Sequence, residues 1–286
     1  MTASITVDGE NLDQLLARGV DGISGLMSVA GTRGSDLLIP GAHGERHVPG
    51  KRSDALDLAL PLWVRGVNPD GSLPGGTDSA ARVAFHGRVR AIVAMFPQGQ
   101  QVTVRHTLTD GDAREILAEV TDVMDMSVRG TGRHTLGQVS VGLRCADPFW
   151  SDVADSTGTA TANSGASVTL SGFAGATAPM ENLLVRFGPS TNPRITQPST
   201  GVYMGWNGVV PSGGSLVVDT AAWRMYGEGG LTIVPADYGQ LYYGGPGTSR
   251  WFALRPQAGG PVVALGHTST GSATAIVTGR RRHRIA

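Results

Sequence analysis

The sequence predicts a mainly β protein of two domains, and three observations support that prediction. The chain has 286 residues, enough for two domains of ordinary size. Only 16% of its residues are charged and 42 are glycine, which is typical of many short strands joined by glycine turns. Apolar and polar residues alternate along several segments, above all Val139–Cys145, with the period-2 pattern of a strand that buries one face.

The end of that strand marks a junction. Asp147 and Pro148 stop it, because proline cannot donate to a sheet ladder and biases the preceding residue towards an extended conformation. Phe149 and Trp150 follow at once. We expect these two aromatic side chains to pack between the domains and to fix their relative angle, since burial of two large rings favours one arrangement.

Composition changes across this junction. Residues 1–150 carry 14 basic and 17 acidic side chains, a net charge of −3, whereas residues 151–286 carry 9 basic and 6 acidic ones, a net charge of +3. We therefore predict one domain at 1–150 and a second at 151–286. The boundary falls at about residues 150–158, and Ser156–Thr159 is expected to form a loop.

The first domain is predicted to hold strands and one helix. A short extended segment at Gly22–Val29 comes first, and a loop interrupted by Gly and Pro follows at residues 40–52. Leu56–Val64 alternates, which predicts a strand, and residues 67–76 are rich in turn residues.

The helix is expected to follow that loop. Asp78 or Ser79 can cap it, because either oxygen can accept an unpaired first-turn N–H. Phe85, Val89 and Ile92 fall on one face at helical spacing, and the pattern ends near Phe96. Further strands are predicted at Gln101–Leu108, at Glu115–Val128 and up to Cys145.

The second domain is predicted to contain strands alone. Nine short segments at nearly regular spacing, with turn residues between them, indicate a β-sandwich. These segments are Ser167–Leu170, Leu183–Phe187, Arg194–Thr196, Gly201–Trp206, Ser215–Asp219, Arg224–Tyr226, Arg250–Phe252, Pro261–Gly266 and Thr274–Thr278.

The sequence contains no recognisable catalytic constellation, so we predict no enzyme activity, no cofactor and no metal. No serine has the glycines of a nucleophile elbow, and the single lysine, Lys51, is not part of a phosphate-binding loop. His43 and His47 have metal-like spacing, but they lie in a Gly/Pro loop rather than a helix. Cys145 lies on the apolar side of its strand, which predicts a buried structural thiol.

Three groups of residues have alternative interpretations. Asp122 and Asp125 are an acid/base pair or, as we prefer, solvated or interface residues, since odd spacing in a strand places them on opposite faces. The basic tail at 280–284 either binds phosphate or, as we prefer, forms a disordered or interface arm. Six aromatic residues are candidates to stack on a sugar: Trp206, Trp223, Tyr226, Tyr238, Tyr242 and Tyr243. The interpretation we prefer is that Trp206 and Trp223 pack in the core or against loops.

This order of features resembles the distal tail proteins of siphophages. The residues that carry the resemblance are Ile39-Pro40-Gly41, His43-Gly44-Glu45, Leu56–Val64 with Gly66, the helix, Asp147–Trp150, Pro193-Arg194-Ile195, Thr200-Gly201, Leu216–Thr220 and Leu254-Arg255-Pro256. The family pattern has Gly after that last proline, whereas this chain has Gln257. The resemblance implies a tail-tube-like N-terminal β domain with one flanking helix, followed by a galectin-like β-sandwich.

The resemblance also implies a function. Distal tail proteins form a homohexameric ring at the distal end of the virion tail, where the ring joins the tail tube to the tip or baseplate. Implied partners are other copies of the chain, the tail tube protein, the tail-tip hub or tail-associated lysin, and the tape measure and receptor-binding proteins. DNA only passes through the lumen. Because the first half of the chain is acidic and acidic groups repel phosphate, Asp122 or Asp125 is expected to face that channel.

Two other functions remain open at this stage. One is a carbohydrate-binding adhesion module of a phage tail or a cell surface, for which the sandwich and its tryptophans argue. The galectin sugar-binding motif is absent, since Trp206-Asn207-Gly208 does not reproduce it. The other is a glycan-active enzyme with an unrecognised acidic pair. No apolar run is long enough for a membrane helix, and the N-terminus is not a signal peptide, so we expect synthesis in the host cytoplasm without a membrane anchor.

Overall fold

The computed structural model describes most of the chain. The described residues are 4–12, 18–19, 29–33, 37–38, 45–46, 52–108, 110–129, 136–245 and 252–286. For 123–129 and for the isolated two-residue strands, the backbone alone is described. The chain divides into two compact units. The first comprises Met1–Ser151 and Arg284–Ala286, and the second Asp152–His283. The last three residues thus belong to the first unit, although the sequence predicted 151–286 as one domain.

The first unit is built on one antiparallel sheet, in the order β2-β1-β9-β10-β11-β8-β3. β12 pairs with β10 and β25. The bounds are β1 Ser4–Val7, β2 Glu10–Asn11, β3 Arg18–Gly19, β8 Leu56–Arg65, β9 Gln101–Thr107, β10 Ala113–Arg129, β11 Leu136–Cys145, β12 Trp150–Asp152 and β25 Arg282–His283. The strands predicted from residue 56 onwards are therefore confirmed. Two short pairs lie apart from this sheet: β4 Thr32–Arg33 with β7 Arg52–Ser53, and β5 Leu37–Leu38 with β6 Glu45–Arg46.

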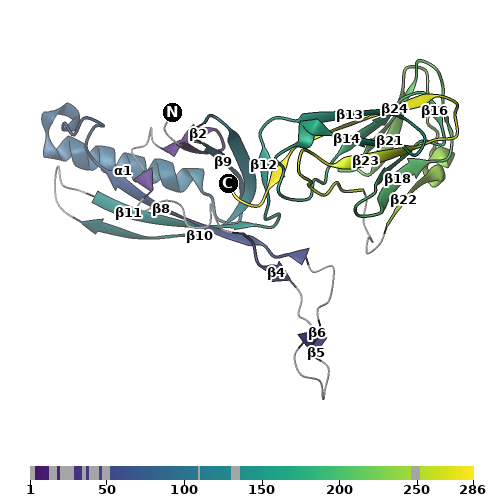
Figure 1. The fold of residues 1–286 in the computed structure, drawn as a ribbon. Coiled ribbons are helices and arrows are strands. Elements are labelled where there is room, and N and C mark those ends of the chain that lie inside the picture. Colours follow the sequence, from purple (N-terminus) through teal and green to yellow (C-terminus); the bar gives the residue numbers. More distant parts are fainter. Residues whose placement is uncertain are drawn as a thin grey trace. The chain divides into compact units, whose positions relative to one another are not determined.

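One helix, α1 (Asp78–Met95), covers one face of this sheet, and Figure 1 shows it running alongside β8. Its N-cap is Thr77, whose Oγ1 accepts from the Ala80 N–H at 3.1 Å, so the predicted caps Asp78 and Ser79 were wrong by one and two residues. A helical stripe from Ala81 to Ile92 packs on the alternate apolar side chains of β8 to β11.

A close approach holds α1 against the end of β8. A Cβ on Gly66 would lie 2.4 Å from the Ala81 carbonyl oxygen, so a side chain there would push the helix away. Arg88 of α1 adds two hydrogen bonds, because its Nη1 donates to the carbonyl oxygens of Arg65 at 2.6 Å and Val67 at 2.7 Å. The helix is thus fixed at this point by backbone contact and by two hydrogen bonds.

The second unit is a β-sandwich, as predicted. One sheet has the order β13-β24-β15-β20-β21 and the other β14-β23-β17-β18-β22, and their inward side chains form one core. The bounds are β13 Ser156–Asn163, β14 Ser167–Thr169, β15 Leu184–Phe187, β17 Arg194–Gln197, β18 Val202–Trp206, β20 Ser215–Asp219, β21 Arg224–Glu228, β22 Leu241–Gly244, β23 Val262–Gly266 and β24 Ser272–Gly279. A small pair joins β16 (Ser190–Thr191) to β19 (Val209–Val210).

Two predictions for the second unit need correction. Ser156–Thr159 is not a loop but the start of β13, which pairs with β24 from Ser156 opposite Gly279 to Asn163 opposite Ser272. Phe252 is buried but lies outside any strand, and the rest of the predicted strand at Arg250–Phe252 lies outside the described residues. The segment at Gly22–Val29, apart from Val29, and the histidines at 43 and 47 also lie outside them.

Candidate functional site

The described residues show no metal-binding arrangement. No group of three or more His, Cys, Asp or Glu side chains converges within the part of the chain that the structure describes. Cys145 is fully buried, which confirms the prediction of a structural thiol; burial raises its pKa to about 12, and the charges of Asp57 and Asp147 add to the effect. None of the helices described is long and apolar enough to cross a bilayer.

The junction residues form a turn that leads into a buried ring. Asp147 Oδ1 accepts from the Phe149 N–H at 3.3 Å, which closes the turn after β11. Pro148 is buried and Phe149 half-buried. Trp150 opens β12 with no exposed surface, and its side chain belongs to the core of the first unit.

The basic tail is folded, not a disordered arm. Arg282 and His283 form β25, and both side chains are buried. The Asp152 carboxylate contacts two basic side chains, His283 through Nε2 at 2.8 Å and Arg281 through Nε. Arg280 pairs with Asp155 at 3.5 Å and Arg282 with Glu181 at 3.7 Å. Of the two predicted alternatives, the disordered arm is wrong, because these three carboxylates pair with the positive charges of the segment. The interface arm stays a prediction.

The two acidic residues of the long strand lie beside irregularities in its pairing. β10 shifts register against β11 between Val120 and Asp122, and again between Val123 and Met126. An extra residue at such a shift interrupts the period of two, so the pairing of β10 does not test the prediction that Asp122 and Asp125 lie on opposite faces. Asp122 is exposed and lies opposite Gly142; the side chain of Asp125 lies outside the described part.

The structure separates the proposed sugar-stacking residues. Trp206 is only 5% exposed and packs in the core, where its ring occupies the space that a side chain on Gly208 would need. Trp223 is 62% exposed in the turn between β20 and β21, with a positive φ of 56° that bulky residues rarely adopt. Tyr226 is half-buried beneath Arg224, whose Cζ is 5.6 Å from the ring centroid.

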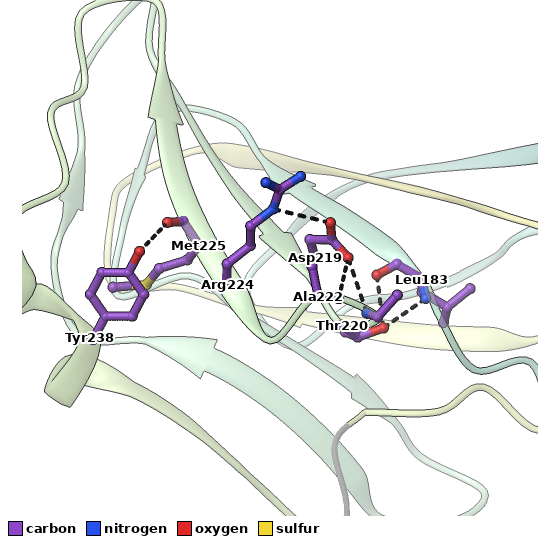
Figure 2. A network of polar contacts seen from close by, with 8 residues as sticks. Leu183, Asp219, Thr220, Ala222, Arg224, Met225 and Tyr238 are labelled. Carbon is purple, nitrogen blue, oxygen red and sulfur yellow. Dashed lines mark hydrogen bonds and ion pairs between the residues drawn. The ribbon is translucent and has the colours of Figure 1, made fainter.

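A polar network holds the turn that presents Trp223, as Figure 2 shows. Asp219 Oδ1 accepts from the N–H groups of Ala221 and Ala222, each at 3.0 Å, and Asp219 Oδ2 accepts from Arg224 Nε at 3.3 Å. Next to it, the buried Thr220 hydroxyl bonds to the backbone of Leu183. The exposed tryptophan therefore projects from an ordered turn.

The outer face of the second sandwich sheet brings together Tyr242, one of the predicted sugar-stacking candidates, and two residues that were not predicted to lie beside it. We call Arg194, Tyr203 and Tyr242 the tyrosine–arginine face. Arg194 Cζ lies 4.2 Å from the centroid of the Tyr203 ring, and the centroids of Tyr203 and Tyr242 are 6.2 Å apart. The signal in the sequence is that a tyrosine is followed two residues later by glycine in both strands, Tyr203 by Gly205 in β18 and Tyr242 by Gly244 in β22.

Comparison with solved structures identifies this architecture. The chain superimposes on the Dit protein of phage SPP1, described as a paradigm of the hub adsorption apparatus in phages that infect Gram-positive bacteria. The TM-score is 0.60 with 18% identity, over 98% of this chain and 99% of that one. The chain has the Dit fold. The predicted resemblance to distal tail proteins is thereby confirmed at the level of fold, across both units.

Other comparisons add little to this result. The chain also aligns with a chain of the phage p2 baseplate in its activated conformation, at 9% identity over 97% of this chain and 98% of that one. The TM-score of 0.36 is too low to support a structural argument. No protein-family model and no curated protein matches the sequence.

Proposed function

We propose that the protein is a distal tail protein, a structural, non-enzymatic subunit whose homohexameric ring joins the tail tube to the tail tip or baseplate. The observation that supports this most is the match to the SPP1 Dit protein over nearly the full length of both chains. On this proposal the protein lies at the distal end of the virion tail. Its partners are the tail tube protein and the tip hub or tail-associated lysin, with the tape measure and receptor-binding proteins as further contacts.

Within the described residues, one edge of the sheet in the first unit is largely unpaired, which supports ring formation. β8 pairs with β11 along its whole length, but among the described residues its other side meets β3 only at Leu62 and Trp63. Backbone groups of an unpaired edge attract another strand, and a closed ring removes such edges. Pro61 lies in the same strand, which fits an edge because proline cannot complete a ladder on both sides.

The ring is tested by oligomeric state and by a pair of lysine variants. We expect purified protein to form a six-membered ring in negative-stain images and a hexamer in native mass spectrometry. Ala59→Lys places a charge on the β8 edge and should shift the protein towards monomers. Ser140→Lys, on the same sheet face but in the central strand β11, should leave the ring intact. Monodisperse monomers at high concentration, with no ring in a reconstructed tail, would overturn the proposal.

We further propose that the sheet face opposite α1 lines the channel through which DNA passes, with Asp122 on it. Acidic groups repel phosphate and release no counterions, so DNA would not adhere. The described side chains on this face carry charges of both signs, because Arg144 in β11 lies opposite Glu119 on one side and Asp57 on the other. A reconstructed tail in which Asp122 points outwards, or in which the 280–284 segment lines the pore, would contradict this assignment.

The junction remains a proposal for Phe149, because the Trp150 side chain belongs to the core of the first unit. The chain passes between the units twice, after Ser151 and after His283, and two connections restrict rotation more than one. Phe149, half-buried beside the first connection, is the residue expected to fix the angle. Phe149→Ala should broaden the distribution of angles between the units in single-particle images, whereas an unchanged distribution would remove Phe149 from this role.

A further inference from the structure

Glycines of the neighbouring strands lie beside the rings of the tyrosine–arginine face. Across β17, β18 and β22, Arg194 is opposite Gly205 and Gly205 opposite Tyr242, while Tyr203 is opposite Gly244. A Cβ on Gly205 would lie 2.5 Å from the Tyr242 hydroxyl, and one on Gly244 would lie 2.9 Å from the Tyr203 hydroxyl. Each ring therefore lies over a glycine of the neighbouring strand, and any other residue there would displace it.

This arrangement places two aromatic rings next to each other on the outer face of the sheet. The planes of Tyr203 and Tyr242 are inclined by 54°, so the two rings are tilted against each other and do not stack. Both side chains are half-buried, with part of each ring accessible to solvent. β22 is the last strand of its sheet among the described residues, so the surface extends to a sheet margin (β18 and β22, Figure 1).

Arg194 differs from the other outward arginines of the sandwich strands. Arg186 pairs with Glu228, and Arg224 pairs with Asp219 at 3.3 Å. Arg194 has no ion pair among the described residues, and its Nε is buried without a hydrogen-bond partner. Its guanidinium stacks on Tyr203 instead, which removes water from one side of the charge.

An arginine held in this way is suited to an anion. Its planar donor fork matches a carboxylate or phosphate, and partial desolvation by an aromatic ring strengthens such a contact. The neighbouring tyrosine rings offer apolar faces and hydroxyls next to the charge, a combination that suits the C–H faces and hydroxyl groups of a sugar ring. The second unit, Asp152–His283, carries eight basic and six acidic side chains, and its net charge of +2 favours a ligand of negative charge.

We propose that Arg194, Tyr203 and Tyr242 form a binding surface for a saccharide that carries an anionic group, either a carboxylate or a phosphate. Arg194 pairs with the anion, and the two tyrosine rings contact the sugar. This surface excludes the predicted Trp206, which is buried, and lies on the other sheet from Tyr226 and the turn of Trp223. The proposal does not depend on ring formation, and the two can fail separately.

The binding test uses the full chain and two pairs of probes. Calorimetry compares trigalacturonate with neutral trigalactose, and phosphorylated maltotriose with maltotriose. We expect one or both anionic saccharides to bind at least tenfold more tightly than their neutral counterparts. The carboxylate and phosphate arms show which anion the surface prefers. Equal binding of charged and neutral members in both pairs, or binding of none, would overturn the proposal.

Variants then locate the binding. Arg194→Gln should weaken the anionic saccharide at least tenfold. Arg224→Gln, which alters an arginine that also lies over a tyrosine but is ion-paired, should leave affinity unchanged. Equal effects of the two variants, or no effect of Arg194→Gln, would show that the binding is elsewhere.

A spectroscopic measurement covers the case in which Arg194→Gln does not fold. The chain has five tyrosines, so tyrosine-labelled wild-type protein gives few ring signals. The signals of Tyr203 and Tyr242 should shift as the anionic saccharide is added, whereas Tyr226 should not. Shifts confined to other tyrosines would exclude this surface.

Discussion

Thr220 holds both backbone groups of Leu183. The Thr220 hydroxyl accepts from the Leu183 N–H at 2.7 Å and donates to the Leu183 carbonyl oxygen at 2.8 Å, and Thr220 is buried (Figure 2). Leu183 directly precedes β15, and Thr220 directly follows β20, so this pair closes the end of a strand pair whose register runs from Leu184 opposite Asp219.

Removal of that hydroxyl should destabilise the sandwich. Thr220→Val keeps the shape of the side chain but leaves the buried Leu183 N–H without its partner, which costs about 1–3 kcal/mol. Thr220→Ser retains the hydroxyl and is the matched control. Urea unfolding of both variants measures the difference, and equal midpoints would show that the hydroxyl contributes nothing.

The backbone conformation of Trp223 should lower the free energy of unfolding. Its positive φ is strained for any residue with a Cβ, whereas glycine adopts that conformation readily. We therefore expect Trp223→Gly to be more stable than Trp223→Ala by about 1 kcal/mol, although glycine loses more entropy on folding. Both variants remove the same exposed ring, so the comparison isolates the backbone. Thermal unfolding that ranks alanine above glycine would refute this account.

Sequence reasoning succeeded where side chains of very different polarity alternate. In Leu56–Val64 and Val139–Cys145 the inward residues are large and apolar, so the period of two is visible in a single sequence. It failed for β13, where the inward positions are Gly158, Ala160 and Ala162 and the outward ones threonine. That contrast is weak, and the strand depends on its partner β24, which lies more than a hundred residues away.

The site was harder to predict than the fold for the same reason. The 280–284 segment is a cluster of positive charge in the sequence, but it is ordered by Asp152 and other distant carboxylates. The tyrosine–arginine face depends on the register of three strands, and a shift of one residue would turn Tyr203 inwards. A single sequence fixes neither contact, because both are set by pairing between segments that are remote along the chain.

His106 should make the first unit sensitive to acid. Desolvation lowers the pKa of this buried histidine below its usual value of 6.5, and the nearby Arg114 charge lowers it further. Below that usual value the unfolded chain binds a proton that the folded chain does not. The free energy of unfolding therefore falls as pH decreases from 7.5 towards 5, by at most about 1.4 kcal/mol per pH unit.

His106→Leu should flatten this dependence, because leucine does not titrate and suits the apolar inward face of β9. Urea unfolding at pH 5 and pH 7.5 measures the change in slope. A wild-type protein and variant with parallel pH profiles would show that His106 is protonated equally in the folded and unfolded states.

Cys145 should have the opposite effect at alkaline pH. Its pKa is about 12 in the folded chain because of burial, against an ordinary value of 9.0. Above pH 9 the unfolded chain therefore loses a proton that the folded chain keeps, and the free energy of unfolding falls as pH rises towards 12. Between pH 8 and pH 10 the loss is about 1.4 kcal/mol.

Cys145→Ala isolates that contribution from other groups that titrate in this range. The variant is less stable at pH 8, since it leaves a small cavity, but its deficit should shrink by the same amount by pH 10. The native thiol should also resist a water-soluble disulfide reagent at pH 8 and react once urea unfolds the chain, because the thiolate is the reactive form. A constant deficit across this pH range, or rapid reaction of the native protein, would show that the thiol ionises in the folded state.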